Sequence, residues 1–175
     1  MTRSGFIDEA VLFSPDIPQP VNTLLQAAVV ASRADKMRAE QLFTEAYQSD
    51  KACLQTYFAL YKFYFYQGRL GEAERFVLAG LEEAARQGGF PSDYRRLYRD
   101  KSKWDMYANE TTLFYLYTLK ALAFIKLRQN LINQGRIILA MMRELDPEDR
   151  SGASVVMALA EALQEERQYE CASSD

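Results

Sequence analysis

Apolar residues recur at spacings of three and four along most of this 175-residue chain, which is the period of helices that bury one face. The pattern predicts helices over residues 22–32, 36–49, 51–67, 70–87, 111–128, 131–145 and 152–169. Several breaks fall at Gly68, Gly88 and Pro147, because glycine and proline do not continue a helix well. We expect Asn22 to cap the first helix. The chain is therefore predicted to be all-α.

The predicted helices form pairs that repeat with a period of 34 residues. Residues 20–53 and 54–87 follow one another without a gap, and a third copy covers about 114–149 after an insertion over 88–113. Small residues stand at the same place in the second helix of each copy, namely Ala39, Ala73 and Gly135. A period of this length indicates a stack of helical hairpins.

The ungapped alignment of the first two copies has consequences for their first helices. It predicts that Ala27 and Val30 are packed inside the first copy. In the second copy it puts Tyr61 where a small residue is expected, so that either the two helices splay or Tyr61 points outward. The third copy ends in the sequence ELDP and needs about two extra residues in its turn, near 128–133.

The two ends of the chain lie outside the repeats. Residues 1–19 are predicted to form an N-terminal arm. The arm either packs as a strap on an apolar surface, or it occupies the groove of the same chain or of a neighbouring chain. The helix over 152–169 is predicted to cap the stack, and residues 170–175 form a tail. The capping helix is expected to turn four apolar residues toward the last hairpin: Val155, Val156, Leu159 and Leu163.

With these small and large residues at fixed offsets, the chain resembles the tetratricopeptide repeat (TPR) family over residues 20–149. The resemblance implies a superhelical stack of three helix-turn-helix repeats with a C-terminal capping helix. It also implies that a partner peptide lies in a concave groove lined by the first helix of each repeat. An unrelated all-α bundle with a similar spacing of helices is the alternative.

The resemblance implies that the groove is lined by apolar and aromatic side chains and by two lysines. The first copy contributes Val21, Leu24, Leu25 and Ala28. In the second and third copies, the implied partner-binding residues are Phe58, Lys62, Phe65, Tyr66, Tyr115, Thr118, Leu122 and Lys126. Such a groove suits a peptide with large side chains and an acidic group. Phe58 and Phe65 are alternatively core residues between neighbouring hairpins, and the asparagines by which chaperone-binding TPR domains hold a C-terminal carboxylate are not matched.

The insertion over 88–113 mixes basic and aromatic side chains. Its predicted partner-binding residues are Arg95, Arg96, Arg99 and Trp104. Arginine, tyrosine and tryptophan dominate the energetics of protein interfaces, so a protein contact is the favoured interpretation. Similar mixtures also bind nucleic acids, but the interleaved aspartates of this segment argue against such a role. A solvated helical loop with its aromatic rings packed beneath the array is the remaining alternative.

Composition narrows the chemistry of the chain. Histidine is absent, and Cys53 and Cys171 belong to no CxxC pair, so we expect no metal site, no cofactor and no enzymatic activity. A net charge of −3 argues against nucleic acid or an anionic membrane as the main partner. We find no apolar stretch that could span a bilayer and no signal-peptide pattern, and free thiols suit a reducing compartment. The protein is therefore predicted to be cytoplasmic.

These patterns together favour a non-catalytic scaffold or chaperone-like adaptor that binds a partner protein or peptide in the groove. The alternative is a structural module that associates with itself, for example as a homodimer, through the arm or through its apolar helices.

Overall fold

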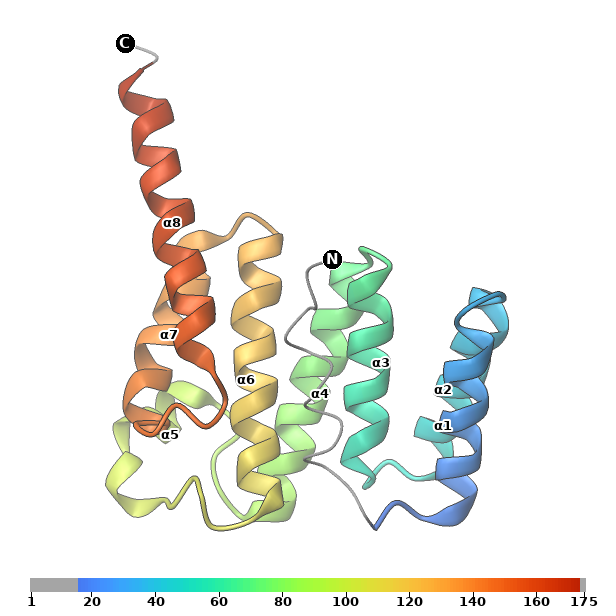
Figure 1. The fold of residues 1–175 in the computed structure, drawn as a ribbon. Helices are drawn as coiled ribbons and strands as arrows, with labels where there is room; N and C mark the ends of the chain where they lie inside the picture. The colour runs from blue at the N-terminus through green and yellow to red at the C-terminus, as the bar shows by residue number, and fades with distance from the viewer. Residues whose placement is uncertain (1–15, 174–175) are drawn as a thin grey trace. The chain divides into compact units, whose positions relative to one another are not determined.

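The computed structural model describes residues 16–173, and every regular element within that range is a helix (Figure 1). In chain order the elements are α1 (Gln19–Ala31), α2 (Lys36–Ser49), α3 (Leu54–Tyr66), α4 (Leu70–Gly88), α5 (Tyr94–Arg99), the 3-10 helix η2 (Lys101–Lys103), α6 (Glu110–Arg128), α7 (Ile132–Leu145) and α8 (Ala153–Ala172). The all-α class predicted from the sequence is confirmed. The predicted N-terminal arm lies outside the described residues up to position 15, and so does the end of the tail at 174–175.

The chain divides into two compact units, Met1–Glu83 and Ala84–Asp175. The division falls inside α4. In unit 1, α1 packs along α2, and α2 contacts α3. In unit 2, α6 and α7 form a hairpin, α8 packs on α7, and α5 lies against α7 (Figure 1). Helix α6 is the most deeply buried element of unit 2, since every residue from Phe114 to Ala123 is buried.

The first helix begins three residues earlier than predicted. Its N-cap is Pro18, and Pro20 lies in the first turn, where a proline costs no hydrogen bond because the first amides of a helix have no partner within it. The amide of Asn22 donates to the carbonyl of Pro18 at 2.9 Å, so Asn22 is inside the helix. The prediction that Asn22 is the cap is wrong.

The second helix of each hairpin starts in the same register. The amides of Ala39, Ala73 and Gly135 donate to the carbonyls of residues 35, 69 and 131, at 3.0, 3.1 and 3.1 Å. All three small residues are buried, as the repeat predicts. A β-carbon on Gly135 would lie 2.7 Å from Cδ2 of Leu127 and 3.1 Å from the carbonyl oxygen of Ala123, so α7 approaches α6 more closely than a side chain at position 135 allows.

The first helices do not share that register, because the connections differ in length. Residues 32–35 join α1 to α2, whereas only three residues, 67–69, join α3 to α4. The extra residue turns α1, so that Ala28 is fully buried while Ala27 and Val30 are exposed. The prediction of packed positions at Ala27 and Val30 is therefore wrong, and Ala28 is the buried residue next to Ala27.

The turns of the second and third hairpins are equivalent. Gly68 and Asn130 both have a left-handed backbone, with φ of 72° and 64°. After each helix the next two amides donate back to the preceding turn: those of Gly68 and Arg69 to the carbonyls of 65 and 64, and those of Asn130 and Leu131 to the carbonyls of 127 and 126. This pair of backbone hydrogen bonds is the Schellman motif. Asparagine is the usual substitute for the left-handed glycine of that motif. The predicted extra residues in the third turn are absent.

The capping helix α8 presents a different face from the one predicted. Ala153 and Ala160 are its fully buried residues, whereas Val155 is 74% exposed and Leu159 is 40% exposed. Val156 and Leu163 are half-buried. Two alanines seven residues apart let α8 lie close to α7, and this contact turns the larger apolar side chains toward solvent. The predicted inward face of Val155 and Leu159 is wrong.

Candidate interaction site

The last turns of α3 carry the most accessible part of the predicted groove. Phe58, Lys62 and Phe65 follow one another at helical spacing on one face of α3, and the Lys62 ammonium lies 5.2 Å from the centre of the Phe58 ring. Phe58 is buried, whereas Lys62 and Phe65 are half-buried. Tyr66 is 53% exposed, and its ring meets that of Phe65 edge to face with centroids 5.8 Å apart. The helix therefore ends in an aromatic pair of which Tyr66 is the exposed member, with a lysine one turn earlier.

Tyr61, which stands where the repeat expects a small residue, points inward. It is 2% exposed, and its ring contacts that of Phe58 edge to face at 5.4 Å. Of the two alternatives predicted for Tyr61, the outward orientation is therefore excluded. Phe58 and Tyr61 thus form a buried aromatic pair within α3, before the exposed end of the helix.

A polar cluster fixes the end of α3 from the other side. Arg69, in the turn after α3, donates to both carboxylate oxygens of Glu40 on α2, at 2.7 and 3.1 Å, and also pairs with Glu72 on α4. The Tyr64 hydroxyl donates to Glu40 at 2.9 Å, and the Arg69 guanidinium lies 4.6 Å from the Tyr64 ring centre. The Tyr64 ring stacks on Phe76 of α4. The cluster joins three helices of unit 1.

The protonation of this cluster follows from its hydrogen bonds. The bond from Arg69 is the largest influence on Glu40 and, with the bond from Tyr64, holds the pKa of the Glu40 carboxyl below its ordinary value of 4.5. Burial, followed by the bond to Glu40, raises the pKa of Tyr64 to about 12. At neutral pH Glu40 is ionised, and Tyr64 remains a hydrogen-bond donor.

Replacing Glu40 with glutamine is expected to lower the melting temperature at pH 7. The folded-state pKa of Glu40 is lowered, so the ionised carboxylate stabilises unit 1 above about pH 4.5, and this contribution is lost as the pH falls through the lowered value. Thermal unfolding followed by circular dichroism should show a clear difference between wild type and variant at pH 7. The difference should narrow as the pH falls below about 4.5 and through the lowered pKa of Glu40. A difference that stays constant over this range would show that ionisation of Glu40 is not its cause.

The third-copy groove residues are mostly core. Tyr115, Thr118 and Leu122 of α6 are buried, and the Tyr115 hydroxyl donates to the carbonyl of Ser92 at 2.7 Å. Burial strongly raises the pKa of the Tyr115 phenol. Lys126 is half-buried. As folded here, Tyr115, Thr118 and Leu122 have no surface to offer a partner, which corrects their assignment to the groove.

The equivalent turns explain this error. When Gly68 is aligned with Asn130, the positions that match Lys62 and Tyr66 are Phe124 and Arg128. Phe124 is half-buried and Arg128 is exposed. The sequence alignment instead placed two extra residues in the turn and so shifted the third-copy assignments by two positions. Asn130 is the sequence signal that could have given the correct alignment of the third copy, since asparagine often takes the left-handed position that ends a helix.

The insertion in unit 2 folds as a short helix on a buried anchor. The Asp93 side chain caps α5 by accepting from the amide of Arg95 at 2.9 Å, and Leu97 is fully buried. Tyr98 donates to Glu144 of α7 at 3.2 Å, and Lys101 forms an ion pair with the same carboxylate. These contacts attach the insertion to the end of α7.

The four insertion residues predicted to bind a partner divide into two kinds. Arg95, Arg96 and Arg99 are exposed on α5, and the Arg95 guanidinium lies over the Tyr94 ring. Trp104 is half-buried, its ring lies near that of Phe90, and its indole N–H is buried without a hydrogen-bond acceptor among residues 16–173. The arginines are therefore available to a partner, and Trp104 serves mainly as packing.

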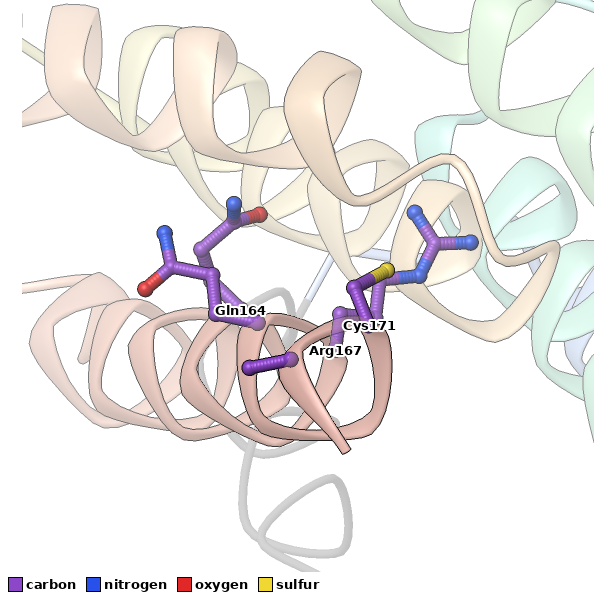
Figure 2. A pocket seen from close by; sticks show the side chains of 5 residues that line it. Gln164, Arg167 and Cys171 are labelled. Atoms are coloured by element: carbon purple, nitrogen blue, oxygen red, sulfur yellow. The ribbon is translucent and has the colours of Figure 1, made fainter. Parts of the chain in front are cut away.

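A shallow hollow follows the C-terminal half of α8, and Figure 2 shows the side chains that line it. They are Gln164, Arg167, Gln168, Cys171 and Ala172. Cys171 is exposed, and Cys53 is a buried free thiol whose pKa burial raises. No group of three or more Cys, Asp or Glu side chains in the described range is placed to hold a metal ion. None of the described helices is long and apolar enough to cross a membrane.

Comparison of the chain with protein-family models, with curated proteins and with solved structures gave no match.

Proposed function

We propose that this protein is a non-catalytic interaction module, a scaffold or chaperone-like adaptor of TPR type, that holds a partner polypeptide on the last turns of α3. The observation that carries the proposal is the exposed Tyr66 beside Phe65 and Lys62, at the end of a helix that is fixed on its other side. The common register of Ala39, Ala73 and Gly135 supports a TPR-like arrangement of the hairpins.

The chemistry of this surface indicates what kind of polypeptide it binds. Two aromatic rings offer a large contact area with few rotatable bonds, and the Tyr66 hydroxyl adds a polar contact. Lys62 supplies a positive charge within the same two turns. A segment with a large apolar side chain and an acidic residue one or two positions away fits this combination. The free cysteines fit a reducing compartment, and we place this activity in the cytoplasm.

The test is affinity capture of partners from extracts of the source cells with a Lys62→Glu/Tyr66→Ala variant. Loss of an aromatic contact and reversal of the Lys62 charge are expected to reduce capture at least about tenfold. The matched control is Met37→Ala, which removes an exposed apolar side chain from α2. Circular dichroism checks that both variants are folded. Equal capture by wild type and by a folded Lys62→Glu/Tyr66→Ala variant would refute the α3 assignment.

A further inference from the structure

Unit 2 carries exposed arginines that have no carboxylate partner within residues 16–173. Three lie on α5, and two more lie on the exposed stripe of α7 with Ala140 between them. The two helices are in contact, and Tyr98 of α5 reaches Glu144 beside the last of these arginines. We call this set the basic surface: Arg95, Arg96, Arg99, Arg136 and Arg143.

The same unit carries glutamates that also lack an ion pair in the described part of the chain. Glu161, Glu165 and Glu166 are exposed on the second half of α8. This half of the helix has no fully buried residue after Ala160. The exposed Val155 and Leu159 precede the glutamates on the same helix. We call α8 from Val155 to Glu166 the acidic surface.

We propose that the acidic surface of one copy of this chain docks on the basic surface of a second copy. Charge complementarity carries the proposal: unit 2 contains both charge sets, and within its fold neither set neutralises the other. Exposed apolar side chains accompany both sets: Ile137 is next to Arg136, and Val155 and Leu159 share a face of α8 with Glu166 at helical spacing. This association uses surfaces other than the α3 site.

Arginine suits this contact better than lysine would. Its aliphatic stem covers apolar side chains such as Val155 and Leu159, while the planar guanidinium binds a carboxylate through two parallel hydrogen bonds. Two different surfaces meet in such a contact. If two copies use both surfaces reciprocally, the result is a closed two-fold dimer, and if they do not, the copies add head to tail.

The experiment compares molar mass by sedimentation and light scattering at about 0.05 M and about 1 M salt, since added salt screens exposed ion pairs. Wild type is expected to associate at low salt and to dissociate at high salt. Arg96→Glu/Arg99→Glu and Glu165→Arg/Glu166→Arg are each expected to weaken self-association at least about tenfold. Mixing these two variants should restore association, because each variant retains the surface that the other has lost.

The matched control is Glu45→Arg, a charge reversal at an exposed position of α2 in unit 1, which should leave association unchanged. Circular dichroism establishes that each variant is folded. A monomeric wild type at low salt would overturn the proposal and would leave the basic surface to a different acidic partner. Association that is unaffected by either charge reversal, or that is not restored in the mixture, would overturn it as well. Normal association of the Lys62→Glu/Tyr66→Ala variant is expected, whichever way the α3 site is decided.

Discussion

Leucine in place of Gly135 is expected to lower the free energy of unfolding of unit 2 by about 3 kcal/mol. A β-carbon at this position would meet Leu127 at 2.7 Å and the carbonyl oxygen of Ala123 at 3.1 Å. The Leu127 side chain can rotate away, but the carbonyl belongs to the backbone of α6 and moves only with that helix. The added side chain therefore forces α7 away from α6 and opens the main helix contact of unit 2.

The single tryptophan of the chain, Trp104, lies in unit 2, so denaturant unfolding followed by its fluorescence reports on the affected unit. The control is Gly71→Leu on α4, where a β-carbon would meet no atom within 4 Å. Gly71 lies in unit 1, so this change is expected to leave the unfolding transition that Trp104 reports unchanged. Equal destabilisation by the two substitutions would show that the close helix approach at Gly135 is not the cause.

Asparagine in place of Asp146 is expected to cost unit 2 about 3 kcal/mol at neutral pH. The two carboxylate oxygens accept four hydrogen bonds: from the Tyr107 hydroxyl at 2.6 Å, the Arg150 amide at 2.9 Å, and the Ser151 amide and hydroxyl at 2.9 and 2.6 Å. Asparagine offers one oxygen, and its NH₂ group would face donors. Two of the four donors would then face an NH₂ group in place of an acceptor.

The pH dependence of this effect has a definite sign. Burial alone would raise the pKa of Asp146, but the hydrogen bonds from Ser151, Tyr107 and Arg150 together hold it below the ordinary 3.8. The carboxylate therefore stabilises unit 2 above about pH 4, and the difference between wild type and Asp146→Asn should narrow as the pH falls through the lowered value. Asp149→Asn is the control, because its exposed carboxylate accepts hydrogen bonds from Ser154 and asparagine tolerates the left-handed backbone there. An equal loss of unfolding free energy in Asp146→Asn and Asp149→Asn would contradict this explanation. A difference between wild type and Asp146→Asn that does not change with pH would contradict it as well.

The helices themselves could be predicted from the sequence because long amphipathic patterns determine them. Periodicity placed α2 and the ends of α6 and α7 correctly, and the small residues Ala39, Ala73 and Gly135 marked buried positions. Helix α5 was not predicted, because six residues are too few for a helical period to be recognised. Leu97, its one buried anchor, is not distinguishable by sequence from an exposed leucine.

Which face of each helix is buried was harder to predict from the sequence than where the helix lies in the chain. One extra residue in the α1–α2 connection decides whether Ala27 or Ala28 is buried, and the sequence does not indicate the length of that turn. Helix α6 is apolar on nearly all sides, so its pattern could not show that Tyr115 faces the core. On α8, contact through small residues outweighed burial of larger ones, and Val155 remained outside.

For the residues predicted to bind a partner, the structure shows which of them reach the surface. Aromatic and basic side chains at the end of α3 are accessible, and Tyr66 carries most of that exposure. The arginines of the insertion are exposed as well, but Trp104 beside them is packed. Sequence shows which side chains are suited to an interface, and packing decides which of them reach the surface.

The central claim, that the end of α3 binds a polypeptide, is tested most directly by site-specific photo-crosslinking in the source cells. A photoreactive aromatic residue is placed at position 66, and the matched position is Met37, which is also exposed but lies on α2. We expect position 66 to give a discrete crosslinked polypeptide that position 37 does not give. No crosslinked polypeptide at position 66, or the same products at both positions, would contradict the proposed function.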